Sequence, residues 1–143
     1  IMLHLVLVLR RLRAGAAGLP KAGQDLFDLF CRDIDDNFRE MGMGDLKVPK
    51  EMQKVGEAFY GRARAYDAAL DSGDPAALTA AVGRNVFGSA EAGLGASMGA
   101  RRLAAYMLGA ARDLEAQAIG PEQLSALKFP APETIAADAA QAP

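Results

Sequence analysis

The sequence predicts an all-α fold, and its composition carries most of that prediction. Alanine occurs 30 times and leucine 17 times among the 143 residues, whereas Val, Ile and Thr together occur 12 times. Alanine and leucine enter a helix at little cost, while β-branched residues favour strands. The length suits one domain with a single core. We expect a compact bundle of about six helices with a central antiparallel hairpin and no sheet over residues 1–128, followed by a Pro- and Ala-rich extended tail over residues 129–143.

The chain opens on an apolar run from Ile1 to Leu9 that is followed by Arg10, Arg11 and Arg13. Nine helical residues rise about 14 Å, whereas a helix that crosses a bilayer needs about 20 residues. The run is therefore either part of a buried core helix or an anchor at a membrane surface, where the arginines would meet anionic headgroups. Because the run starts without a methionine, we expect further residues upstream of it.

A second helix is predicted between Pro20 and Gly42. Its apolar residues recur at spacings of three and four, which is the pattern of one helix face. These residues are Phe27, Phe30, Ile34, Phe38 and Met41. Pro20 suits a first helical turn because its missing N–H is not needed there, and Gly42 is suited to cap the end of the helix.

A third helix is predicted from about Pro49 to Asp71, antiparallel to the second. Its apolar stripe again alternates spacings of four and three. The stripe consists of Val48, Met52, Val55, Phe59, Ala63, Tyr66 and Leu70. Gly56 and Gly61 lie inside this helix, and each costs about 1 kcal/mol relative to alanine, which indicates that another helix crosses closely there.

The clearest boundary in the sequence is Asp74-Pro75, since aspartate is a good N-cap and proline fits the first helical position. A fourth helix should begin there and end before the Gly- and Ala-rich stretch 88–96. A fifth helix is expected over about 97–118, and a short sixth helix over 121–127.

Several classes of function are excluded by a shortage of the residues they need. A net charge of −2 and a pI near 5.4 argue against a DNA-binding surface. Cys31 is the only cysteine and His4 the only histidine, so neither an internal disulfide nor a Cys/His zinc site can form. His4 lies in an apolar run, which favours a core histidine over a catalytic base. We expect no catalytic residue, no bound metal and no cofactor.

One acidic cluster could gather a cation on the second helix. It consists of Asp33, Asp35, Asp36 and Glu40. Such carboxylates could hold Mg²⁺ in a small-molecule-binding or isoprenoid-processing helical protein. Arg32 and Arg39 are interleaved with them, which favours an ordinary solvated face.

Basic residues concentrate in the first half of the chain, where residues 1–64 hold eleven Lys and Arg against nine Asp and Glu. Lys47, Lys50 and Lys54 can line one side of the third helix. A run of this kind is either a solubilising face or, together with the arginines at 10, 11 and 13, a surface that faces a membrane or a ribosome.

Several segments resemble the ubiquinol–cytochrome c chaperone family. The most specific are residues 33–46 (DIDDNFREMGMGDL), 58–63 (AFYGRA) and 66–70 (YDAAL), and residues 7–12 (LVLRRL) and 84–88 (RNVFG) are similar as well. The resemblance implies a non-enzymatic assembly factor of the respiratory chain, which binds newly made cytochrome b and supports assembly of the cytochrome bc1 complex.

Mitochondrial members of that family bind cytochrome b, associate with the ribosome and work with a small partner subunit. The resemblance therefore implies cytochrome b as the client, a ribosome or a small subunit as further partners, and no DNA. It places a bacterial relative in the cytoplasm, peripheral to the inner membrane, which corresponds to the matrix side in mitochondria. A plain helical adaptor with an unrelated partner is the remaining alternative.

A chaperone for an apolar helical client needs an accessible hydrophobic groove with a polar border, and methionine suits such surfaces because its side chain adapts to many shapes. Our candidate contact residues are Met41, Met43, Asp45, Leu46, Met52, Phe59, Tyr60, Arg62 and Tyr66. Met52, Phe59 and Tyr66 fit a packed core stripe equally well. Tyr60 lies off that stripe and is the better candidate for a contact.

Overall fold

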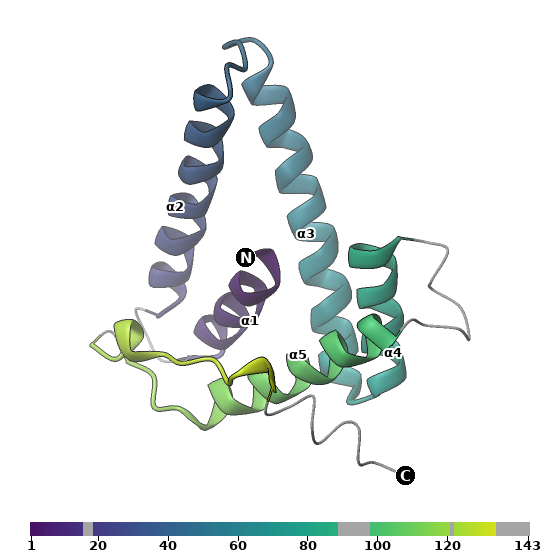
Figure 1. The fold of residues 1–143 in the computed structure, drawn as a ribbon. Coiled ribbons are helices and arrows are strands. Elements are labelled where there is room, and N and C mark those ends of the chain that lie inside the picture. Colours follow the sequence, from purple (N-terminus) through teal and green to yellow (C-terminus); the bar gives the residue numbers. More distant parts are fainter. Residues whose placement is uncertain (16–18, 89–97, 121, 134–143) are drawn as a thin grey trace.

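A computed structural model of the chain describes residues 1–15, 19–88, 98–120 and 122–133 (Figure 1). Five α-helices span most of these residues, and no strand occurs among them. The helices are α1 (Met2–Arg13), α2 (Leu19–Glu40), α3 (Val48–Ser72), α4 (Pro75–Val82) and α5 (Met98–Ala116). A π-helical turn, η1 (Gly83–Phe87), continues α4. The all-α prediction is confirmed.

The predicted sixth helix is wrong within the described residues. Residues 122–127 contain a single 3-10 turn, η3 (Leu124–Ala126). A segment this short makes fewer than two helical turns, and so few turns do not repay the cost of helix nucleation. The Gly- and Ala-rich stretch from residue 89 and the tail from residue 134 lie outside the described residues.

The α2–α3 hairpin projects from the rest of the molecule. Its two helices meet at the loop over residues 41–47 and diverge toward the base, where α1 lies between them (Figure 1). Gly42 has φ +81°, its N–H donates to the Arg39 carbonyl at 2.9 Å, and the Met43 N–H donates to the Phe38 carbonyl at 3.0 Å. This is a Schellman motif, and it confirms Gly42 as the helix cap.

The hydrophobic core lies at the base of the hairpin, where α1 contacts α2, α3 and α5 and where α4 packs on α3 and α5. Its largest fully buried side chains in α1, α4 and α5 are Val6, Leu7, Leu12, Leu78, Val82, Met107 and Leu114. The apolar run at the start of the chain is thus a core helix, and no helix in the described part of the chain combines the length and apolarity that crossing a membrane requires.

The boundary at Asp74 is as predicted, because its carboxylate accepts a hydrogen bond from the Ala76 N–H at 2.8 Å and Pro75 is the first residue of α4. The expected helix crossing at Gly56 and Gly61 is wrong. A Cβ placed on either glycine would meet no atom within 4 Å, so both lie on an open side of α3.

The chain after α5 packs back onto the core. The Gln117 side-chain amide donates to the Lys128 carbonyl at 2.8 Å, and its oxygen accepts from the Lys128 N–H at 2.9 Å. Phe129 then lies edge-on against His4 of α1, with ring centroids 4.6 Å apart. The first residue of the predicted tail is therefore docked against the helices.

Candidate functional site

An apolar groove opens at the base of the hairpin, where α1 meets α2 and α3. Its walls come from all three helices and are mostly aliphatic or aromatic. The lining residues are Val6, Leu9, Leu12, Arg13, Pro20, Gly23, Gln24, Phe27, Phe59, Tyr60 and Ala63. The cavity has a volume of about 160 Å³. Arg13 and Gln24 add polar groups to the apolar lining, and a polar rim is common around exposed apolar sites.

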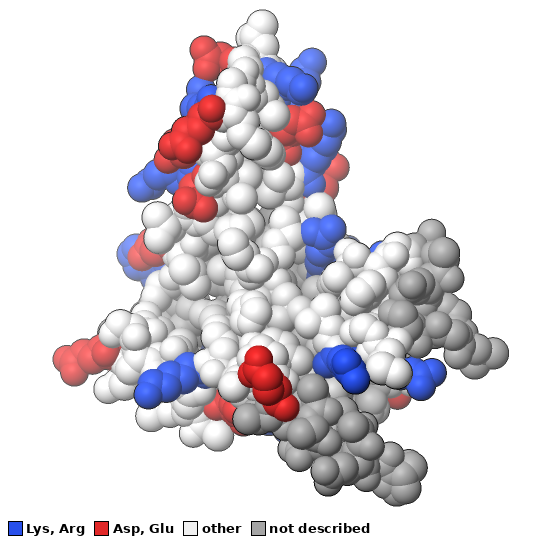
Figure 2. Space-filling view, in the orientation of Figure 1, with Lys and Arg blue, Asp and Glu red and all other residues white. Residues whose placement is uncertain are grey.

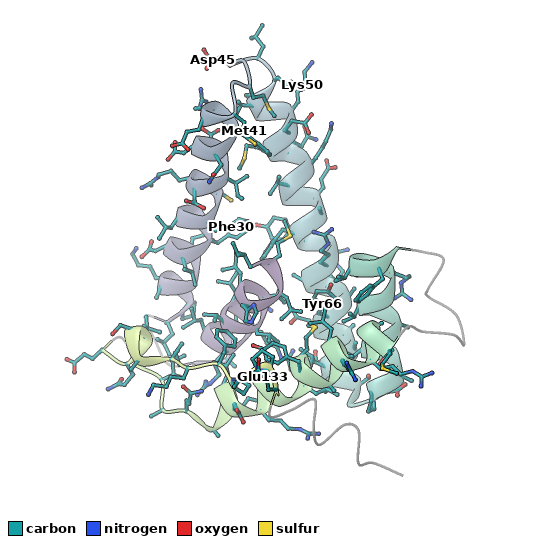
Figure 3. The ribbon with its side chains drawn as sticks, in the orientation of Figure 1. Phe30, Met41, Asp45, Lys50, Tyr66 and Glu133 are labelled. Carbon is teal, nitrogen blue, oxygen red and sulfur yellow. The ribbon has the colours of Figure 1, made fainter. Side chains whose placement is uncertain are left out.

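Three aromatic rings, those of Phe27, Phe59 and Tyr60, line this groove, and the ring of Phe30 packs against Phe27 and Phe59. Phe27 of α2 lies 4.8 Å from Phe59 and 5.6 Å from Tyr60 of α3, measured between ring centroids, and Phe59 and Tyr60 meet edge to face at 5.7 Å. Phe30 projects from α2 into the space between the two arms and reaches Phe59 at 6.1 Å (Figure 3). Such offset and edge contacts stabilise aromatic clusters.

Phe59 and Tyr60 are neighbours in α3 but differ in their exposure to solvent. Phe59 is 4% exposed and belongs to the core, whereas Tyr60 is 58% exposed and lines the groove from its rim. The sequence placed Tyr60 off the packed stripe, and the structure agrees with that placement. Tyr60 is therefore the contact candidate with both access to solvent and an apolar neighbourhood.

The other predicted contact residues do not gather at the groove. Met41 and Asp45 lie at the far end of the hairpin (Figure 3). They are exposed, as is Leu46 of the same loop, and Met43 of that loop is half-buried. From Val48 to Phe59, helix α3 rises about 16 Å over eleven residue steps, which separates this end from the groove.

Three further candidates have other surroundings. Tyr66 is buried in the core, where desolvation raises the pKa of its phenol. Met52 is half-buried on the arm of α3. Arg62 donates a hydrogen bond to the Met2 sulfur of α1 at 2.9 Å. The structure thus divides the predicted set among the core, the groove and the hairpin end.

Sequence reasoning missed the wall of the groove that α1 provides. The apolar run that contains Val6 and Leu9 is expected from sequence to be either a core helix or a membrane-surface anchor, since nothing local says which helices that run will separate. Phe27 had been recognised only as part of the α2 stripe. The one sequence signal for the groove is the presence of an apolar first helix beside the apolar stripe of α2.

The three N-terminal arginines lie around a second cavity of about 570 Å³ between α1, α3 and α5. Arg10 pairs with Asp71 at 2.6 Å, and this hydrogen bond raises the pKa of its guanidinium. Arg13 pairs with Asp67 at 2.5 Å. Arg11 donates to backbone carbonyls near the end of α5. These contacts tie α1 to α3 and α5, and a membrane- or ribosome-facing role for the arginines stays a prediction.

The acidic side of α2 and the lysines of α3 form the flanks of the hairpin. Figure 2 shows charged side chains along both flanks and a largely uncharged face between them. Arg39 pairs with Asp35 and Lys54 pairs with Glu51. Within the described ranges, no group of three or more His, Cys, Asp or Glu side chains is arranged to hold a metal ion.

Comparison with known proteins identifies the family. No curated protein matches the chain. Among solved structures, the crystal structure of the Cbp3 homolog from Brucella abortus matches with a TM-score of 0.74 and 36% sequence identity, covering 92% of this chain and 71% of that one. The sequence model of the ubiquinol-cytochrome C chaperone family matches residues 1–120. Since this match spans most of the sequence, the chain belongs to the ubiquinol-cytochrome C chaperone family.

Proposed function

We propose that this chain is a non-enzymatic chaperone that holds newly made cytochrome b in the apolar groove while the cytochrome bc1 complex is assembled. The observation that supports this most directly is an aromatic wall with a half-exposed Tyr60, set in a groove built by three helices. An apolar helix docks in such a groove through side chains spaced three or four residues apart.

The size of the groove favours a helical client over a small molecule. Pockets for drug-sized ligands and cofactors have volumes of roughly 300–1,000 Å³. The groove holds about 160 Å³, which is enough for a side chain or two and too little for a whole cofactor. The face of the hairpin above it is largely uncharged and offers a longer track to the same client (Figure 2).

The client is an integral membrane protein, so the proposed site of action is the inner face of the membrane, with the chaperone bound peripherally. A ribosome or a small partner subunit as additional partner rests on the family resemblance alone.

The test is a pull-down from membranes of cells that produce tagged full-length chain, with cytochrome b measured by mass spectrometry and assembled bc1 complex measured by native electrophoresis. Tyr60→Ala removes the rim of the groove, and Ala63→Leu fills it. Both variants should recover less cytochrome b and support less bc1 complex. Leu29→Ala removes an equally exposed apolar residue of α2 that does not line the groove, and should change neither.

Circular dichroism and thermal unfolding establish that each variant is folded. If the Tyr60→Ala and Ala63→Leu variants are folded and recover as much cytochrome b as the unchanged chain does, the groove is not the client-binding site.

A further inference from the structure

The end of the hairpin, residues 41–50, carries an apolar side chain that nothing in the fold covers. We call these residues the hairpin apex. Leu46 is 91% exposed and Met41 is 71% exposed, whereas Val48 is fully buried two residues after Leu46. The chain therefore buries one apolar residue of the apex and leaves another exposed, in the loop at the far end of the hairpin from the core (Figure 1).

The loop that presents Leu46 is an ordered turn. The Gly44 carbonyl accepts hydrogen bonds from the N–H groups of Lys47 at 2.8 Å and Val48 at 3.2 Å, which fixes the start of α3. The Schellman motif at Gly42 fixes the end of α2 from the other side. Leu46 is thus held outward by the backbone on both sides of it.

The charges around Leu46 are unevenly paired. Asp45 is bound by Arg39 at 2.6 Å, and Glu51 is bound by Lys54 at 2.8 Å. Lys47 and Lys50 are exposed and have no ion-pair partner among the residues that the structure describes. Glu40, in the last turn of α2, likewise has no ion-pair partner among the described residues.

We propose that the hairpin apex docks on a membrane that contains anionic phospholipids, with Leu46 inserted among the headgroups and Lys47 and Lys50 against their phosphates. An exposed apolar residue flanked by lysines matches the boundary between acyl chains and phosphates, since lysine can keep its charge at the surface while its stem lies along apolar groups. A contact with ribosomal RNA would pair the lysines with phosphates but would not account for the exposed apolar side chain of Leu46.

This inference rests on the proposed function, in which the chaperone binds peripherally to the membrane, and it names the residues that would make that contact. With the apex on the membrane, the groove lies about 16 Å away along α3. The groove would then stay outside the bilayer, within reach of client segments at the surface.

The experiment is flotation of the purified full-length chain with vesicles of phosphatidylcholine, with or without phosphatidylglycerol. Leu46→Ser should weaken binding to the mixed vesicles about tenfold, which is the loss expected when one leucine no longer leaves water. Lys47→Gln and Lys50→Gln should each weaken it about fivefold, and together should abolish the preference for anionic vesicles.

Matched controls make these losses specific. Leu29→Ser removes an exposed leucine elsewhere on α2, and the pair Lys21→Gln and Lys128→Gln removes the same charge from exposed positions away from the apex. These variants should float like the unchanged chain. Equal losses in the control and apex variants would overturn the proposal, as would an unchanged chain that binds neither kind of vesicle.

Two further measurements separate the alternatives. If the lysine variants lose binding to purified ribosomes while vesicle binding is unchanged, the apex is a ribosome contact and the lipid proposal is wrong. Recovery of detergent-solubilised cytochrome b measures client binding at the groove without any contribution from membrane binding by the apex. Apex variants should recover it normally and Tyr60→Ala should not, so a failure of the apex proposal can be told apart from a failure of the chaperone proposal.

Discussion

The imidazole of His4 in α1 lies 2.8 Å from the phenol of Tyr106 in α5, measured from Nε2 to Oη. The two residues are 102 positions apart in the sequence, and their hydrogen bond joins the first helix to the last. Phe129 covers the same imidazole edge-on. Burial lowers the pKa of His4.

This contact predicts that the protein loses stability as the pH falls through the ordinary range of histidine. Because the folded-state pKa is below the unfolded value near 6.5, the unfolded chain binds the proton more readily. The free energy of unfolding should therefore decrease from about pH 7.5 to about pH 5.5. Urea unfolding at several pH values measures this.

His4→Gln is the control for that prediction. His4 is the only histidine, so the variant should have a much flatter pH dependence over the same range. The same slope in both proteins would assign the effect to other groups.

The open side of α3 gives a second prediction. Gly56→Ala and Gly61→Ala should each stabilise the protein by about 0.5–1 kcal/mol, because alanine has the higher helix propensity and its Cβ meets nothing within 4 Å. Gly73→Ala is the matched control. At φ +67° that glycine caps α3, so alanine there should destabilise by about 1 kcal/mol. A loss of stability at position 56 or 61 would mean that the added methyl group meets a neighbour.

The parts of the fold that could be predicted are those with local signals. The spacing of apolar residues located α2 and α3, Gly42 marked the end of α2, and Asp74 marked the start of α4, because caps and periodicity depend on residues a few positions apart. The sequence could not show that α1 separates the hairpin arms, since that depends on contacts between distant segments. Gly56 was misread for the same reason.

The candidate site was predictable to a similar extent. Tyr60 could be singled out because it leaves the stripe of its own helix. The groove beside it could not, since its other walls come from α1 and α2. Leu46 is among the predicted contacts, but only the structure shows that it is 91% exposed and does not line the groove.

The two roles considered for Met52 differ in their cost on truncation. Met107 is fully buried, so Met107→Ala should destabilise the protein by about 2–5 kcal/mol. Met52 is only half-buried on the arm of α3, and Met52→Ala should cost about 1 kcal/mol or less. Chemical unfolding of both variants tests this. A similar cost at both positions would make Met52 part of the core.

Substitutions of the three N-terminal arginines should lower the free energy of unfolding by different amounts, because only Arg11 donates to backbone carbonyls at the end of a helix. Arg11 donates to the carbonyls of Leu114 at 2.9 Å and Gln117 at 3.1 Å, where helix α5 ends and its carbonyls lack partners. Arg11→Met keeps the aliphatic stem but loses both bonds, so it should cost about 1.5–3 kcal/mol. Arg13→Met breaks an ion pair whose arginine is mostly exposed, and should cost less than about 1 kcal/mol. Urea unfolding of the two variants at moderate ionic strength gives the comparison. If Arg11→Met is as stable as Arg13→Met, the guanidinium of Arg11 is not needed to hold α5 against α1 and is available for a partner instead.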